Sequence, residues 1–399
     1  MKKIRSNKSL TWISDTEKKY INDVLSSGEL TNFTGTLNTK DENILFNKSK
    51  DILSIRGNSY LGGDYVRRAE DLISKLVSID YAVMHNSATS CLFSAITALG
   101  LEKNSNIAVS GISFSATAAS IVAAGMKPVM IDVDETLNMS PIALQQIIET
   151  DKSIKAVLFV EWAGRSNNLL KIKEICTFEG IPMIEDSSQA VLSKIDGTNT
   201  FCGCVGDIGI FSLNGPKTFS IGEGGFSVTN NKFFAASMRL TRNHAEAYKV
   251  ITRSPELNFA DGFNFRPTEI SAAIALAQLE RRDQLKAIRQ QNYKYLFDKL
   301  KDHFVIEDSV QMPDSPYSFV FSVKDPSLKQ KVINFAQRND ISIFGGYPVE
   351  HWELYNQTEL LSGCEKYRLN YLTIYQIGYP NNSNDMQIIV NILIKSLNF

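Results

Sequence analysis

FSLNGPKTFSIGEGG, residues 211–225, sets a single lysine, Lys217, between a strand-like apolar run and a cluster of glycines. Glycines at this density allow the backbone to turn tightly or to lie close against another group. A lysine in such a turn is by default a solvated side chain on a surface hairpin. The alternative is a lysine that reaches into a binding site while the glycines let the chain approach a flat ligand. The residues that follow the other expected strands help to decide between these interpretations.

The overall composition is that of a soluble globular protein. The 399 residues are more than one compact core usually holds, so we expect two domains. Hydrophobic residues make up 43% of the chain and charged residues 21%, which is ordinary for that class. The formal net charge of −1 provides no overall basic field, so neither nucleic acid nor a membrane is an expected partner.

Cysteines and histidines do not form a metal-binding pattern. The five cysteines are scattered, and the C-x-C of Cys202 and Cys204 has no second Cys/His pair at ligand spacing. With only four histidines in addition, no metal site is predicted. The N-terminal residues lack the apolar core of a signal peptide, and no apolar run reaches membrane-spanning length. Together with thiols that fit a reducing compartment, this predicts a cytoplasmic protein.

Short apolar segments alternate with helix-like segments between residues 81 and 230. Several apolar segments are nearly continuous, as strands buried on both faces require. The segments 87–100 and 115–125 have the pattern of helices. This alternation predicts an α/β layer with a largely parallel sheet flanked by helices. The expected strands are 81–85, 106–111, 127–134, 155–162, 181–187, 207–213 and 224–230.

The two ends of the chain do not show this alternation of strand-like and helix-like segments. A capped helix is expected at 14–28, followed by a long loop at 29–63 whose length is typical of functional loops. Residues 266–301 read as one long helical stretch, and short strand-like and helical segments follow it. We therefore predict a large domain over 1–255 and a smaller α+β domain over 256–399, joined through the long helix.

Polar residues follow the expected strands at points where a ligand could bind. In open α/β sheets, ligands bind beyond the carboxyl ends of the strands. Residues 86–89 (NSAT) begin a helix, where free backbone N–H groups suit a phosphate, although plain N-capping explains them equally well. Asp186 follows a buried strand, where a carboxylate is costly unless a cation meets it. An Asp beside a cationic ring nitrogen and a lysine that forms a Schiff base are used by pyridoxal phosphate (PLP) enzymes.

Two rival phosphate-binding motifs fail on spacing. In a P-loop the lysine follows a glycine directly, but Pro216 separates Gly215 from Lys217, and Gly209 stands one residue too far upstream. A dinucleotide fingerprint is also missing, because no G-x-G-x-x-G follows any expected strand.

Five segments, taken together and in order, resemble the DegT/DnrJ-type sugar aminotransferases of PLP fold type I. The resemblance runs from about residue 11 to the C-terminus. IEDSSQA followed by GD…FS….K…GEGG is its specific part, and the other segments alone are weak. It implies a large domain with a mostly parallel central sheet and a smaller C-terminal α+β domain. The segments are NSATS (86–90), SFSATAASIVAAGMKPVMIDVD (113–134), IPMIEDSSQA (181–190), GDIGIFSLNGPKTFSIGEGG (206–225) and GFNFRPTEISAAIALAQL (262–279).

The resemblance implies roles for four residues around the cofactor ring. Lys217 would carry PLP as a Schiff base, and Asp186 would pair with the pyridine nitrogen. Gln189 would sit beside the phenolic oxygen, and Phe114 would stack on the ring. These four positions match the family motifs residue by residue.

Further residues are implied at the cofactor phosphate. Ala88, Thr89 and Ser212 would bind it from the same chain. Asn264 resembles the residue that the family sends into the phosphate site of the partner subunit. The resemblance therefore implies a homodimer whose active sites are shared across the interface.

The chain departs from the family pattern at three places. Many members have a histidine in the segment that here reads VEWAGRS (160–166), where this chain has Glu161. An acidic G-D-E-V is replaced by KNSNIAV (103–109), and residues 32–60 look expanded. None of these touches the core PLP residues, but they leave the substrate open. Glu161, His244 and His351 are the candidate substrate contacts.

The activity implied by the resemblance is transamination, with pyridoxamine phosphate formed during turnover. The amino group would move, by resemblance from glutamate, to a keto or aldehyde sugar. The acceptor would most often be nucleotide-linked, for amino-sugar and surface polysaccharide biosynthesis, and an oxidised sugar acid remains an alternative. A sugar dehydratase on the same fold is a second alternative, but those relatives carry histidine where Lys217 stands. A PLP-binding sensor without catalysis is the third, although the chain has no basic footprint for DNA.

Overall fold

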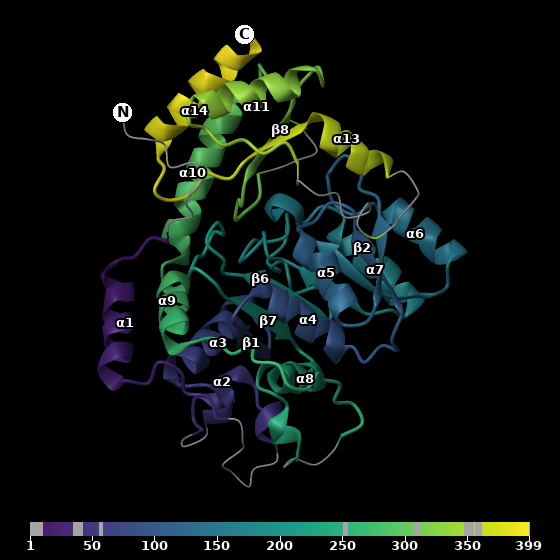
Figure 1. Ribbon diagram of the computed structural model, residues 1–399, viewed down its shortest axis with the longest axis vertical. Coiled ribbons are helices and arrows are strands. Elements are labelled where there is room, and N and C mark those ends of the chain that lie inside the picture. Colours follow the sequence, from purple (N-terminus) through teal and green to yellow (C-terminus); the bar gives the residue numbers. More distant parts are fainter. Residues whose placement is uncertain are drawn as a thin grey trace.

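A seven-stranded sheet forms the centre of the protein (Figure 1). The computed structural model describes residues 11–34, 43–55, 59–249, 254–306, 312–346, 355 and 361–398. The strand order is β1-β7-β6-β5-β4-β2-β3, in which β7 runs antiparallel to both neighbours and the other pairs are parallel. This confirms the predicted α/β class with a mostly parallel sheet. The strands are β1 (Tyr81–His85), β2 (Asn106–Ser110), β3 (Lys127–Ile131), β4 (Ile154–Val160), β5 (Met183–Asp186), β6 (Ile208–Ser212) and β7 (Gly225–Thr229).

Helices cover both faces of this sheet (Figure 1). Successive side chains of a strand point to opposite faces, and β4 shows the result. Leu158 and Val160 join the apolar cluster of α4 and α5, whereas Val157 and Phe159 join the cluster of α6 and α7. Both faces of the central strands are therefore buried away from water, as the continuous apolar runs predict. These helices are α4 (Ala88–Ala98), α5 (Ser115–Ala123), α6 (Pro141–Thr150) and α7 (Leu169–Glu179), with η3 (Trp162–Gly164) after β4.

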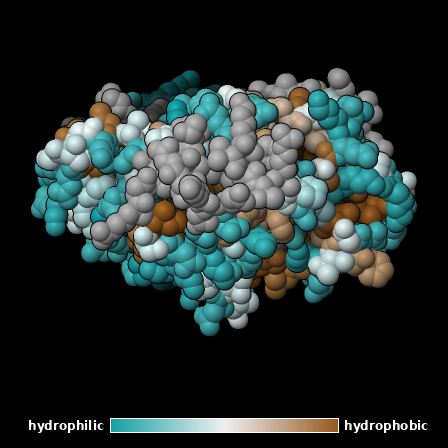
Figure 2. All heavy atoms as spheres, turned by 90° about the horizontal axis from the view of Figure 1, so that it is seen from below, coloured by the Kyte–Doolittle hydropathy of each residue, from teal (hydrophilic) through white to brown (hydrophobic). Residues whose placement is uncertain are grey.

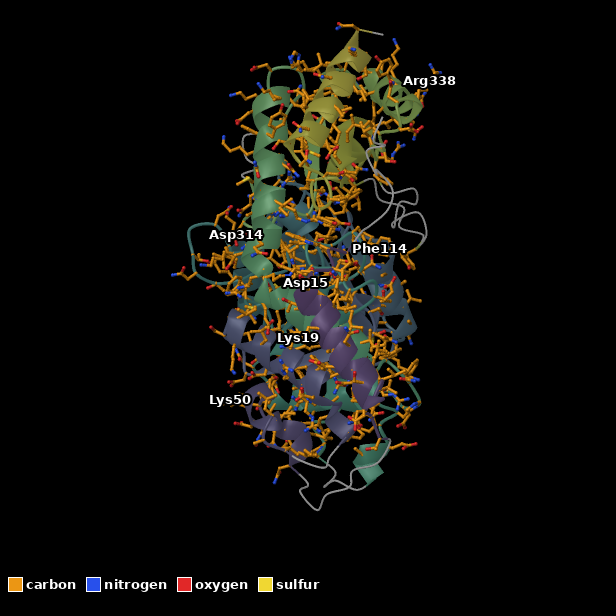
Figure 3. All side chains as sticks on the ribbon, turned by 90° about the vertical axis from the view of Figure 1, so that its left-hand side faces the viewer. Asp15, Lys19, Lys50, Phe114, Asp314 and Arg338 are labelled. Atoms are coloured by element: carbon orange, nitrogen blue, oxygen red, sulfur yellow. The ribbon has the colours of Figure 1, made fainter. Side chains whose placement is uncertain are left out.

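Helix α1 (Asp15–Ser27) lies against α9 (Glu269–Glu280), which in turn packs on α3 (Asp64–Val77) (Figures 1 and 3). The predicted capping box is present, since Ser14 and Glu17 bond each other's backbone or side chain at the start of α1. Glu17 is fully buried and also accepts hydrogen bonds from Gln278 (2.9 Å) and Arg281. One carboxylate therefore starts the helix and fastens it to the end of α9.

The predicted long loop at 29–63 contains short helices where it is described. Its apolar residues are the reason, because Ile44, Leu45 and Ile52 are buried in one cluster with Leu240 of α8. Residues 35–42 and 56–58 lie outside the described part of the chain. The elements of this region are η1 (Ile44–Phe46), α2 (Ser49–Ile52), η2 (Ser59–Leu61), α8 (Lys232–Arg242) and η4 (Glu246–Lys249).

The C-terminal elements form a smaller unit with its own apolar cluster. The long helix expected at 266–301 is two helices, because Arg281 leaves the helical conformation (φ −99°, ψ 15°) between α9 and α10. α9 shares its apolar cluster with α3, whereas α10 shares one with α14. The boundary at residue 255 stays a prediction, and this packing favours a junction at Arg281. The elements of the smaller unit are α10 (Arg282–Leu300), β8 (Phe319–Ser322), α11 (Leu328–Arg338), α13 (Ser362–Asn370), β9 (Tyr371–Ile374) and α14 (Ser383–Leu397).

Polar contacts also join the two units. The carboxylate of Asp314 accepts hydrogen bonds from Nζ of Lys286 on α10 (2.6 Å) and from the backbone of Lys194 (3.0 Å), at the level where the units meet (Figure 3). The face seen in Figure 2 is mostly hydrophilic, with separate small hydrophobic patches. No helix among the described residues is both long and apolar enough to cross a membrane.

Candidate active site

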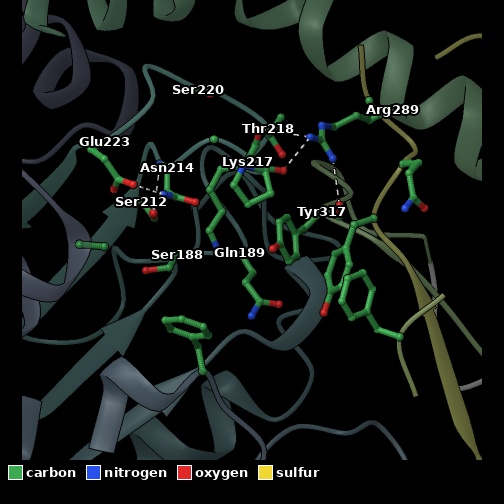
Figure 4. A pocket seen from close by; sticks show the side chains of 18 of the residues that line it. Ser188, Gln189, Ser212, Asn214, Lys217, Thr218, Ser220, Glu223, Arg289 and Tyr317 are labelled. Carbon is green, nitrogen blue, oxygen red and sulfur yellow. Dashed lines mark hydrogen bonds between the residues drawn. The ribbon is translucent and has the colours of Figure 1, made fainter. Parts of the chain in front are cut away.

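A cavity of about 980 Å³ lies between the carboxyl edge of the sheet and the smaller unit. The sheet side of its wall comes from the ends of β5 and β6 and from the first turns of α4 and α5. The opposite wall includes Tyr317 of the smaller unit (Figure 4), and Tyr375 of the same unit also lines the cavity. The structure brings seven of the residues predicted from the sequence to this one space: Ala88, Thr89, Phe114, Asp186, Gln189, Ser212 and Lys217.

The loop that carries Lys217 owes its course to the sheet. β5 and β6 are parallel neighbours, so Asp186 and the residues after Ser212 emerge at the same edge. The chain then turns back and enters the antiparallel strand β7 at Gly225. A Cβ at Gly225 would lie 2.8 Å from the backbone nitrogen of Ala88, so only glycine lets β7 pass this close to the start of α4.

The start of α4 combines a helix cap with a place for an anion. Oγ of Ser87 accepts a hydrogen bond from the backbone of Ser90 (3.1 Å), which caps the helix. The backbone N–H groups of Ala88 and Thr89 are in the first turn of the helix, so no helical carbonyl four residues earlier accepts a hydrogen bond from them. They line the cavity beside Ser212, and the helix dipole favours negative charge there. The two interpretations of this segment are thus compatible.

Asp186 is a buried carboxylate held by hydrogen bonds rather than by an ion pair. One oxygen accepts from Oγ1 of Thr117 (2.9 Å) and the other from the backbone of Ser188 (3.2 Å). Thr117 in turn accepts from Oγ of Ser113 (2.5 Å). Within the described residues Asp186 takes part in no salt bridge. A cationic ring nitrogen in the cavity would supply the missing counter-charge.

Lys217 extends into the same space (Figure 4). Its Nζ lies 4.3 Å from the ring centroid of Tyr317. Desolvation lowers the pKa of the Lys217 amine to about 8, with Arg289 acting in the same direction and Asp186 against it. A lysine with this pKa is partly neutral near pH 8, and the neutral amine is the form that reacts with an aldehyde.

The remaining ring contacts fit a flat, anionic cofactor. Phe114 stands at the start of α5, lines the cavity and has 57% of its surface exposed, which suits a side chain that stacks on a ligand ring. Gln189 lines the cavity, and its Oε1 is fixed by the backbone N–H of Ala163 (2.8 Å). With Lys217, Asp186 and the start of α4, these residues could hold PLP. No cluster of potential metal ligands is found in the part of the chain that the structure describes.

The predicted substrate contact Glu161 does not line the cavity. Val160 ends β4 and faces the cavity, so the next side chain points the other way. Glu161 is fully buried, its Oε2 accepts a hydrogen bond from Oγ of Ser187 (3.0 Å), and it lies close enough to Glu185 for the two carboxyl groups to interact. Its assignment as a substrate contact is corrected by this position.

Glu161 and Glu185 form a buried acid pair behind the site. The carboxylate of Glu185 accepts backbone hydrogen bonds from Gly203 (2.8 Å), Val205 (2.6 Å) and Gly206. Burial raises the pKa of Glu185, and these three donors oppose that effect and favour its charged form. Burial, and then the charge of Glu185, hold the pKa of Glu161 well above its usual range. We therefore assign the shared proton to Glu161.

Three predicted residues remain: Asn264, His244 and His351. Asn264 is exposed and its Oδ1 accepts from Nε of Arg266 (2.9 Å). His244 lies close to Asn264, since the backbone N–H of His244 donates to the carbonyl of Phe263 (2.9 Å). Neither Asn264 nor His244 lines the cavity of its own chain. His351 lies outside the described residues. The predicted reach of Asn264 into a partner subunit stays a prediction.

Several cavity residues were not predicted from the sequence. Thr117 had a signal, because its segment follows a strand and begins a helix in the same way as residues 86–89. Tyr317, Tyr375 and Arg289 had none, because they come from the smaller unit and only the fold brings them to the site.

Comparison with known proteins supports the resemblance seen in the sequence. Residues 46–366 match the DegT/DnrJ/EryC1/StrS aminotransferase family. The chain is 30% identical over 223 residues to the UDP-4-amino-4,6-dideoxy-N-acetyl-beta-L-altrosamine transaminase of Campylobacter jejuni, covering 56% of this chain and 58% of that protein. It is 31% identical over 239 residues to GDP-perosamine synthase of Caulobacter vibrioides, covering 60% and 62%. The chain thus spans less than two thirds of these relatives.

The fold itself matches over nearly the whole chain. The structure of Helicobacter pylori PseC, an aminotransferase involved in the biosynthesis of pseudoaminic acid, superposes with a TM-score of 0.82. The superposition covers 99% of both chains at 21% sequence identity, so it speaks for the fold alone.

The acid pair predicts an asymmetry between two conservative substitutions. Glu161→Gln should cost below about 1 kcal/mol of unfolding free energy, because an amide can donate to Glu185 as the protonated acid does. Glu185→Gln should cost about 3 kcal/mol, because an amide cannot accept from three backbone N–H groups. Denaturant unfolding of both variants beside the wild type measures this, and equal costs would contradict the proton assignment.

The same pair predicts a pH dependence. The folded state keeps a proton on Glu161 that the unfolded chain releases above about pH 4.3, so the unfolding free energy falls as pH rises until the raised pKa is passed. The slope from this group is about 1.4 kcal/mol per pH unit. Glu161→Gln lacks this proton, so its melting temperature should rise relative to that of the wild type as pH increases. Thermal unfolding of both proteins across pH measures the difference.

Proposed function

The chain belongs to the DegT/DnrJ/EryC1/StrS aminotransferase family, and we propose that it transfers an amino group, with PLP as cofactor, to a keto or aldehyde sugar. The observation that carries this proposal is the meeting of Lys217 and Asp186 in one cavity beside the open start of α4. Bound PLP supplies an aldehyde that takes up the amino group and a ring that accepts the electron pair released at the donor Cα.

Each residue of the cavity has a definite task in this reaction. Lys217 would hold the cofactor through its amine, and the free amine could move the proton of the donor Cα. Asp186, with its charge stabilised by Thr117, keeps the ring nitrogen protonated. The start of α4 and Ser212 hold the phosphate, and Phe114 covers the ring.

The acceptor is proposed to be a nucleotide-linked sugar and the donor glutamate. The names of the Campylobacter and Caulobacter relatives support the nucleotide-linked sugar, and the family resemblance supports glutamate. A cavity of about 980 Å³ has room for more than the cofactor. The presence of Lys217 argues against the dehydratase alternative, whose members carry histidine there. The five free cysteines support a reducing cytoplasm as the location.

A homodimer is part of the proposal. Phe263 is 38% exposed and lies on the same surface stretch as Asn264, next to Phe93 (ring centroids 4.9 Å apart). The backbone of Asn86, just before α4, donates to Phe265 (2.9 Å), so this stretch adjoins the expected phosphate site. An exposed stretch beside the start of α4 could meet a second subunit there, as the proposed role of Asn264 requires.

Borohydride reduction followed by peptide mapping tests the proposed function directly. With PLP added, the reduced pyridoxyl group should be found on Lys217, because its amine has the lowered pKa and faces the site. Lys217→Ala should still bind PLP weakly through the phosphate and should lose transamination. A pyridoxyl group on another lysine would contradict the assignment.

Asp186→Asn should affect the chemistry more than the fold. The amide keeps the shape but loses the charge that holds the ring nitrogen protonated, so the half-reaction rate with glutamate should fall by about a hundredfold or more. Thr117→Val removes one hydrogen bond to the same carboxylate and should lower that rate by about tenfold. Stopped-flow absorbance measures both rates. Wild-type rates in Asp186→Asn would exclude the role in ring protonation.

Subunit mixing tests the proposed reach of Asn264. Asn264→Ala and Lys217→Ala should each be nearly inactive, and mixing them should restore activity. In a hybrid dimer one site has both residues, so random pairing should give about a quarter of wild-type activity. No recovery after verified subunit exchange would show that Asn264 serves only its own chain.

A further inference from the structure

Arg289 projects from α10 into the wall of the cavity (Figure 4). Its two terminal nitrogens each donate to a pair of consecutive backbone carbonyls. Nη2 donates to the carbonyls of Pro216 and Lys217, both at 3.1 Å. Nη1 donates to those of Tyr317 (2.9 Å) and Pro316 (3.5 Å). One guanidinium therefore joins the loop of Lys217, the segment that leads into β8, and α10.

The charge of Arg289 is not matched by an acid. The side chain is 7% exposed, and across the described ranges of the chain it forms no salt bridge. Burial lowers the pKa of this guanidinium to about 10 despite the opposing effect of Tyr317. A buried cation that bonds only to carbonyls is costly. The planar fork of arginine suits two carbonyl pairs, and lysine has no equivalent geometry.

Gly378 makes room for this arrangement. A Cβ at this position would lie 2.8 Å from Cζ and 2.8 Å from Nη2 of Arg289. The guanidinium is rigid and held by its four bonds, so it could not give way without losing them. The segment at Gly378 therefore closes the guanidinium in from another side.

The carbonyls that Arg289 holds belong to the two residues that meet in the cavity. The ring of Tyr317 lies 4.3 Å from Nζ of Lys217, and the same guanidinium fixes the backbone of both. The Lys217 loop is also held by turn hydrogen bonds within itself, such as Gly215 to Gly222 (3.0 Å) and Lys217 to Asn214 (3.0 Å), and by Ser220, whose Oγ lies 2.8 Å from Oγ1 of Thr11. Arg289 thus ties this loop to the smaller unit.

We propose that Arg289 is a positioning residue that holds the Lys217 loop against the smaller unit, so that the amine stands at the face of Tyr317 where an aldehyde cofactor can react with it. This inference rests on the proposed function, because it presumes that Lys217 is the reacting amine. Small displacements of a reacting group have large effects on rate, so a loop between two strands needs such support. A role as a binding site for a substrate anion is disfavoured, since carbonyls already occupy the donors of both terminal nitrogens.

Three variants of the 399-residue chain test the proposal. Arg289→Lys keeps the charge but cannot bond both carbonyl pairs. Gly378→Ala keeps Arg289 and displaces its guanidinium. Arg282→Lys is the matched control on the same helix, where the arginine is half-exposed and makes one long bond to a carbonyl (3.4 Å).

Two readouts are measured on each variant. Hydrogen exchange without cofactor should show faster exchange at the amides of Gly215 and Lys217 in Arg289→Lys and Gly378→Ala, and no change in Arg282→Lys. The rate at which added PLP forms its Schiff base, followed by absorbance, should fall by about tenfold in the first two variants. If Arg289→Lys does not fold, the same comparison with Gly378→Ala decides.

The outcomes separate this inference from the proposed function. If the wild type captures no PLP on Lys217, the proposed function fails, and the inference fails with it. If the wild type reacts and Arg289→Lys reacts equally fast, only the inference is overturned. A lower melting temperature with unchanged exchange and capture would mean that Arg289 merely stabilises the fold, which also overturns it. Unchanged capture with weaker binding of sugar or glutamate would show an anion site instead.

Discussion

Strands that are buried on both faces leave only their ends for polar chemistry, and this constraint sets the place of the site. β4, β5 and β6 run parallel, so their carboxyl ends meet along one edge. Asp186 ends β5, and Lys217 follows β6 in the loop that returns as β7. The glycines that drew attention to this loop are needed because β7 passes close to the start of α4, where Gly225 meets Ala88. Asp186 and Lys217 are neighbours because the parallel strands that lead to them end at the same edge of the sheet.

The parts of the fold that could be predicted are those with a strong local pattern. The continuous apolar runs between residues 81 and 230 predicted the central sheet, since exposed strands do not carry such runs. The single helix expected at 266–301 was wrong in its length, because its interruption at Arg281 has no local signal such as proline or glycine. The side chain of Arg281 bonds Glu17 of α1, a contact across the fold that no window of sequence reveals. The short helices within 29–63 were missed for the same reason, since their apolar residues are explained only by burial against α8.

The candidate site follows the same division. The meeting of Asp186 and Lys217 could be predicted because Asp186 ends an apolar strand and Lys217 comes shortly after the next one, and the family motifs named their neighbours. Glu161 was misplaced by one position: in a strand, adjacent residues face opposite sides, so Val160 reaches the cavity and Glu161 does not. Which of the two faces the ligand depends on how the sheet is covered. Arg289 and Tyr317 come from a unit that begins far along the chain, so their part in the site depends on how the two units pack together.

The buried charges around the strand ends explain why these residues belong to one arrangement. Asp186, Glu185 and Glu161 stand at the ends of adjacent strands, and three ionised carboxylates there would repel one another without solvent to screen them. The proton on Glu161 removes one charge, and three backbone N–H groups satisfy the charge of Glu185. Of these three carboxyl groups, Asp186 is the one that lines the cavity, and it accepts hydrogen bonds from Thr117 and Ser188. Burial lowers the pKa of the Lys217 amine, with the charge of Asp186 acting against this and the charge of Arg289 acting with it. Asp186 at the strand ends thus favours a cationic ring nitrogen, while burial between the two units favours the neutral amine of Lys217, and the proposed aldehyde cofactor would need both.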